Sequence, residues 1–97
     1  MDKLKIEIST DFMQVPNSGR LLSESINLYF DYDKIILNFE SKPPYSFAKQ
    51  FFYSLWTNHS IEIIKNKIVI YDKSIQGLIE VIGIEFLKQT NVRSKGV

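Results

Sequence analysis

The side chains best suited to chemistry lie in one stretch, where a double proline is followed by a serine. In KPPYSFAKQFF, residues 42–52, the prolines interrupt regular structure and the residues after them have helical spacing. Ser46 is therefore expected at a helix start, where its hydroxyl can cap the unpaired N–H groups. The same N–H groups and the positive end of the helix dipole favour a phosphate. Ser46 is thus a helix cap or a phosphorylation site, with Lys42 and Lys49 placed to pair with the phosphate.

The helix expected over 46–58 has an unusually wide apolar arc. Its core-facing positions are Phe47, Ala48, Phe51 and Leu55. Phe52 and Trp56 widen the arc to about half of the helical wheel, whereas a core-facing stripe needs a little over ~100°. Either a neighbouring helix covers Phe52 and Trp56, or they form a contact patch. We predict that at least one of them lies in a protein contact, and burial of both within the monomer would contradict this.

Other catalytic and metal-binding patterns are missing from the sequence. The single histidine, His59, lies near a helix end, and the sequence contains no nucleophile elbow whose serine it could activate. The four glycines are scattered, so no phosphate loop is expected, and a chain without cysteine excludes disulfides and thiolate zinc sites. We therefore expect no enzyme activity, no metal and no cofactor. A small ligand in a crevice near Asn38 and Tyr45, at the end of the sheet, remains an option.

Charge and hydropathy limit the classes of binding partner and the cellular location that we expect for the protein. Twelve basic and eleven acidic residues leave a net charge of +1, which predicts no binding to nucleic acid or to an anionic membrane surface. No apolar run is long enough to cross a bilayer, and the N-terminus lacks a signal-peptide core. The lack of cysteine fits a reducing, cytoplasmic location.

Around these residues the chain alternates strands with helices. Strands are expected over 4–8, 35–39 and 67–71, and helices over 20–30, 46–58 and from Ser74 onward. Ser18 or Asn17 can cap the first helix, and a short extra strand is expected over 12–15. The apolar run 35–39 predicts a central strand covered on both faces. Residues 61–64 form a hairpin strand or a packed connection, and the weak Lys-Asn turn signal favours the connection.

The last helix is expected to end at Gly83, where its apolar period breaks. Ile84, Phe86 and Leu87 then dock as a short separate piece. We expect one domain over residues 1–89 and a flexible tail over 90–97. The fold class is α/β, with a largely parallel or mixed sheet and about three helices in the order β-α-β-α-β-α.

Two longer stretches resemble the STAS domains of anti-sigma-factor antagonists, and more closely the small STAS-like family of unknown function. These stretches are IILNFESKPPYSFAKQFFYSLW and KIVIYDKSIQGLIEVIGIEFL. Asn38 matches the polar residue at the end of the buried strand and Ser46 the serine at the helix start. Ile82-Gly83-Ile84 resembles the turn of the last helix. Arg20 and the pair Phe47-Ala48 resemble features of the STAS-like family.

The resemblance implies a non-enzymatic regulatory module that docks a protein partner, such as a histidine-kinase-like ATPase. The docking surface would comprise six residues around the helix start: Lys42, Tyr45, Ser46, Lys49, Phe52 and Trp56. No aspartate precedes Ser46 and no glycine follows it, which favours an alternative, a phage-type or mobile-element inhibitor that uses the fold as a scaffold to block a host or defence protein. A homodimer is compatible with either hypothesis.

Overall fold

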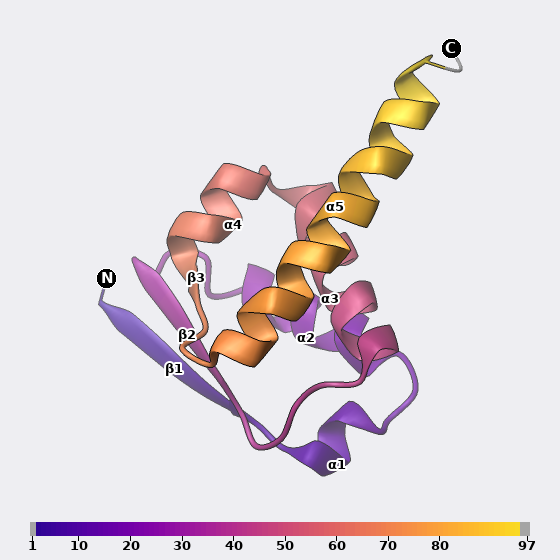
Figure 1. Ribbon diagram of the computed structural model, residues 1–97. Helices are drawn as coiled ribbons and strands as arrows, with labels where there is room; N and C mark the ends of the chain where they lie inside the picture. Colours follow the sequence, from indigo (N-terminus) through magenta and orange to yellow (C-terminus); the bar gives the residue numbers. More distant parts are fainter. Residues whose placement is uncertain (1, 96–97) are drawn as a thin grey trace.

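A computed structural model describes the backbone of residues 2–95 and the side chains of residues 2–89. Three parallel strands, β1 (Lys3–Ile8), β2 (Lys34–Phe39) and β3 (Ile68–Val69), form one sheet in the order β1-β2-β3. The helices gather on one side of this sheet (Figure 1). The predicted α/β class with a parallel sheet is confirmed.

The described residues contain five helices, so the expected number of about three is wrong. They are α1 (Thr10–Met13), α2 (Ser18–Asn27), α3 (Tyr45–Asn58), α4 (Ile61–Lys67) and α5 (Lys73–Lys95). The two unexpected helices are short and each begins at a serine cap. Ser9 Oγ accepts from the N–H of Phe12 at 3.1 Å, and Ser60 Oγ accepts from the N–H of Ile63 at 3.2 Å.

The two capped helices overlap segments 12–15 and 61–64, for each of which the sequence allows a strand. α1 occupies the place of the short strand predicted over 12–15, and that prediction is wrong. Residues 61–64 belong to α4, so the packed connection is confirmed over the hairpin. β3 is shorter than expected because Lys67 ends α4, and the Lys67 ammonium donates to the carbonyl of Phe30 at 2.8 Å.

The sheet has one covered face and one open face. Adjacent parallel strands in chain order place right-handed crossovers on the same side, and this side holds the buried residues Ile35 and Leu37. On the other face Asn38 is exposed and Ile36 is half-buried between its strand neighbours Lys5 and Val69. The prediction that this strand is covered on both faces is therefore wrong.

α2 and α3 pack closely over the covered face. A Cβ at Gly19 would lie 2.6 Å from the carbonyl oxygen of Phe47, so only glycine allows this approach. Asn17 holds the N-cap position of α2 in the left-handed region, with φ of 64° and no side-chain cap bond. The carboxamide oxygen of Gln50 in α3 accepts from the N–H of Arg20 at 3.2 Å, which links the α2 start to α3 instead.

α5 runs through Gly83 without a break, so the predicted helix end there is wrong. Gly83 has no positive φ, and a Cβ built on it would lie 3.5 Å from Cη2 of Trp56. Gly83 therefore lies where α5 packs on α3, at a distance that leaves room for a Cβ. The predicted flexible tail falls on residues that have helical backbone to Lys95, while residues 96 and 97 lie outside the described part of the chain.

Candidate functional site

Ser46 does not cap α3. The helix begins one residue earlier, at Tyr45, and Pro44 occupies the N-cap position without a side-chain cap bond. Ser46 is exposed in the first turn. The cap hypothesis is therefore wrong, because Pro44 presets the backbone and leaves the serine inside the helix. The hydroxyl stays accessible from solvent beside the first N–H groups of the helix.

The two lysines expected beside Ser46 have other neighbours. The ammonium of Lys49 lies 5.4 Å from the centre of the Tyr53 ring, a cation–π contact. Lys42 is exposed and its charge contributes to lowering the pKa of Asp72, although the main causes are the hydrogen bonds from the Ser74 hydroxyl and N–H. Lys49 thus lies against the Tyr53 ring, while Lys42 remains exposed.

Tyr45 joins the start of α3 to α5. Its hydroxyl donates to the carboxylate of Glu85, and this bond is the main cause that raises the pKa of Tyr45 to about 12. The ring itself remains exposed. Tyr45 is therefore accessible to a partner while its hydroxyl holds the two helices together.

Phe52 and Trp56 are both buried, with 3% and 8% of their surface exposed. α5 covers them: the rings of Trp56 and Phe86 have centroids 5.3 Å apart, and Phe52 lies 5.5 Å from Trp56. The prediction that one of them forms an exposed contact patch is wrong, and the alternative, cover by a neighbouring helix, is confirmed. Four of the six predicted docking residues thus lie around the first turn of α3, and two lie beneath α5.

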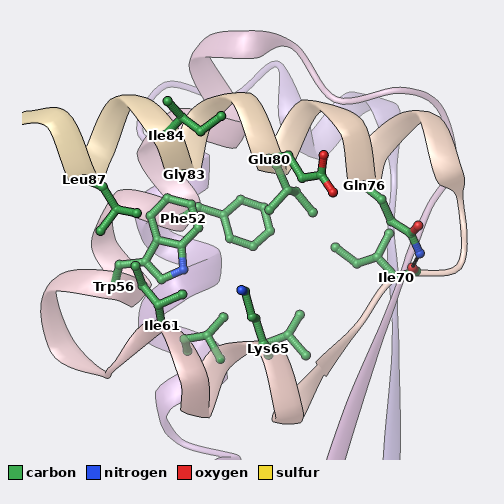
Figure 2. A pocket seen from close by; sticks show the side chains of 13 residues that line it. Phe52, Trp56, Ile61, Lys65, Ile70, Gln76, Glu80, Gly83, Ile84 and Leu87 are labelled. Carbon is green, nitrogen blue, oxygen red and sulfur yellow. Dashed lines mark hydrogen bonds between the residues drawn. The ribbon is translucent and has the colours of Figure 1, made fainter.

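A solvent-open cleft of about 440 Å³ lies between α4, β3 and α5, with Phe52 and Trp56 at its inner side (Figure 2). Leu87 reaches into it from α5 and Ile61 from α4 (Figure 2). The cleft was not predictable from the periodicity of any single element. The available signal was the wide apolar arc of α3 together with the apolar residues that continue past Gly83, which were assigned to a separate piece.

The polar groups of the cleft lie at its edges. Lys65 extends from α4 with its ammonium toward α5, and Glu80 stands on the α5 side (Figure 2). Gln76 is fixed by its own bond, since its amide nitrogen donates to the carbonyl of Ile70 at 2.6 Å. An apolar floor with a charged rim suits the apolar face of an amphipathic segment.

A smaller hollow of about 180 Å³ lies on the open sheet face beside Asn38, Tyr71 and Asp72. The Asn38 amide donates to the Glu7 carboxylate at 2.6 Å. Tyr45 does not line this hollow, so the structure does not bring Asn38 and Tyr45 together in one crevice.

The contacts of His59 are those of a residue that stabilises the fold. It is the C-cap residue of α3, its ring stacks on Phe30 at 3.9 Å, and its Nε2 lies 2.7 Å from the Asn27 side-chain oxygen. Over residues 2–95 there is no group of three or more His, Cys, Asp or Glu placed to hold a metal ion. Over the same residues no helix has the length and apolar character needed to span a membrane.

Comparison with known proteins gives no match: no family model, no curated protein and no solved structure is similar to this chain. The STAS resemblance therefore stays a prediction.

Proposed function

We propose that the protein is a non-enzymatic interaction module that binds an apolar helical segment of a protein partner in the cleft between α4 and α5. The observation that carries the proposal is the solvent-open cleft with the Phe52 and Trp56 rings at its inner side. The rings of Phe52 and Trp56 are themselves almost fully buried, so a partner would cover the exposed apolar side chains that line the cleft with them, Ile84 and Leu87. Two helices flanking an apolar groove suit a third helix laid between them.

Leu87 is an exposed side chain that the partner segment would cover. It is 47% exposed and lines the cleft near Trp56 (Figure 2). Leu87→Glu would place a charge in the apolar part of the contact, where it loses its hydration. Val81 provides a matched control: it is 54% exposed on the same helix and does not line the cleft.

The test uses wild type, Leu87→Glu and Val81→Glu as baits for affinity purification from the source cells, followed by calorimetric titration with the recovered protein. We expect wild type and Val81→Glu to bind alike and Leu87→Glu to bind at least about tenfold more weakly. Equal affinity of all three would contradict docking in the cleft. Circular dichroism checks that each variant is folded.

The exposed hydroxyl of Ser46 supports a second, regulatory surface at the start of α3. Because Ser46 is not used as a cap and is exposed, a kinase could modify it without disturbing a capping bond. A STAS-type regulator would carry phosphate at Ser46 in the recovered protein, and Ser46→Asp would change partner affinity. An inhibitor that uses the fold as a scaffold would carry no phosphate there, and Ser46→Asp and Ser46→Ala would bind equally.

A further inference from the structure

β1 is an edge strand with free backbone groups. Within residues 2–95 the sheet pairs it with β2 alone. The carbonyls of Asp2 and Ile8 accept from the N–H groups of Asp33 and Glu40, at 3.1 and 2.9 Å, on the β2 side. Backbone groups of successive strand residues point to opposite edges. The groups that point to the free edge therefore belong to the alternate residues, Lys3, Lys5 and Glu7.

The free edge is also bordered by apolar surface. A hollow of about 560 Å³ lies between β1 and α2, lined by Leu4 and Ile6 of the strand, by Leu21 of the helix and by Tyr29 in the turn that follows the helix. Leu21 is 43% exposed and Tyr29 is 44% exposed. A strand added at this edge would gain backbone hydrogen bonds and bring further side chains against this hollow.

The side-chain pattern of β1 is complementary to itself. The side chains of Lys5 and Glu7 point to the open face of the sheet. Those of Leu4, Ile6 and Ile8 point to the covered face. When a second β1 runs antiparallel through Ile6, each Lys5 lies opposite Glu7 of the second copy. Leu4 then lies opposite Ile8 of the second copy. Opposite charges and apolar pairs placed in this way stabilise antiparallel strands.

The backbone and the charges select the same register. Only registers that pair odd-numbered residues with odd-numbered ones connect the free N–H and C=O groups across the edge. Centring the axis on Lys5 would place Lys5 opposite Lys5 of the second copy, and centring it on Glu7 would oppose two glutamates. Like charges directly opposite are destabilising, so the register centred on Ile6 is favoured.

We propose that the protein forms a two-fold homodimer through antiparallel pairing of β1 with β1 of a second copy, centred on Ile6. The product is a continuous six-stranded sheet whose junction is bordered in each copy by Leu21 of α2 and by Tyr29, just after α2. This inference does not depend on the docking function, because the cleft lies beside β3 at the other edge of the sheet. Both clefts therefore stay open in the dimer.

Light scattering coupled to size exclusion, from micromolar to millimolar concentration, tests the dimer through a charge exchange. Wild type is expected at about twice the chain mass of 11.3 kDa. Lys5→Glu alone and Glu7→Lys alone each oppose like charges twice, and we expect each to raise the dissociation constant at least about tenfold. Mixed together, the two variants regain opposite charges and should form a one-to-one heterodimer. The double variant should again form a homodimer.

Two results would overturn the proposal. One is a wild type that stays monomeric up to millimolar concentration, which would leave the edge to another protein's strand or to no strand. The other is a dimer that both single variants form as well as wild type does, which would place the interface elsewhere, such as the α4–α5 cleft.

Lys5→Pro tests the backbone pairing separately, because it removes an N–H that the monomer does not use. We expect this variant to keep the circular dichroism spectrum of the fold and to be monomeric. Retention of a wild-type dimer by Lys5→Pro would contradict pairing through β1, even if the charge variants failed to fold.

Discussion

The hydroxyl of Tyr45, in the first turn of α3, donates a hydrogen bond to the carboxylate of Glu85 on α5. On the helical wheel of α5, Glu85 lies opposite Gln76 and Leu87, which line the cleft. The bond therefore fixes the side of α5 that faces away from the cleft. It ties the surface around Ser46 to the helix that forms one wall of the cleft.

This bond predicts an abnormal tyrosine titration. The pKa of Tyr45 is raised to about 12, chiefly by the hydrogen bond to Glu85. A raised folded-state pKa means that the contribution of this bond to stability is complete below about pH 10 and is lost as the pH rises through about 12. We expect Glu85→Gln to lower the pKa of Tyr45 toward its ordinary value. Ultraviolet titration of the phenolate, with Tyr45→Phe to identify the signal, measures this pKa.

Ser46 variants should have small effects on stability. Ser46 does not cap α3, so Ser46→Ala should change the free energy of unfolding by less than about 0.5 kcal/mol. Ser46→Asp places a negative charge in the first turn and should stabilise the fold by about 0.3–1 kcal/mol. Urea denaturation measures both. A loss of about 1 kcal/mol in Ser46→Ala would instead indicate a capping role.

Substituting three glycines by alanine, one at a time, distinguishes the effect of close packing from the effect of helix propensity. Gly77 has open space at its Cβ position and Gly83 has ordinary contact distance to Trp56, so alanine at either should stabilise α5 by about 0.5–1 kcal/mol. Gly19→Ala would force a Cβ to 2.6 Å from the Phe47 carbonyl oxygen and should destabilise by about 1–3 kcal/mol. Thermal unfolding of the three variants gives the comparison, with Gly77→Ala as the control. Equal effects at Gly19 and Gly77 would contradict the α2–α3 packing.

Ser23→Ala should stabilise the protein. The Ser23 side chain is fully buried in α2, and its hydroxyl has no hydrogen-bond partner among the described residues. Removing an unpaired buried hydroxyl recovers its desolvation cost, so we expect a gain of about 1 kcal/mol in the free energy of unfolding. Chemical denaturation measures the gain, and Ser25→Ala, on the exposed side of the same helix, controls for the change in helix propensity.

Elements with a strong local period were predictable from the sequence. α3 ends at Asn58 as expected and starts one residue before the expected serine, and β1 and β2 lie where alternation and apolar runs indicated. α1 and α4 were not predicted because they have only 4 and 7 residues, too few for an apolar helical period to repeat. Their starts depend on single serine caps, at Ser9 and Ser60, that a period search does not detect.

The position of the cleft depends on packing that local sequence does not encode. Gly83 has the residue type of a helix end, yet it lies inside α5, where it faces the Trp56 ring. Treating Gly83 as a terminus separated Ile84 and Leu87 from the residues that they accompany on the cleft wall. The open sheet face was missed for a related reason, because the run of apolar residues in β2 includes Ile36 on the uncovered side.

The pairing of β1 with β2 has a consequence for how the molecule acquires its shape. Every residue of β1 meets a partner thirty-one positions further along the chain, as Lys3 does with Lys34. Contacts between such distant positions slow the search for the native arrangement, while helical turns form quickly. During synthesis β1 therefore leaves the ribosome well before its partner strand β2. Its backbone N–H and C=O groups stay unpaired until α2 and β2 have emerged.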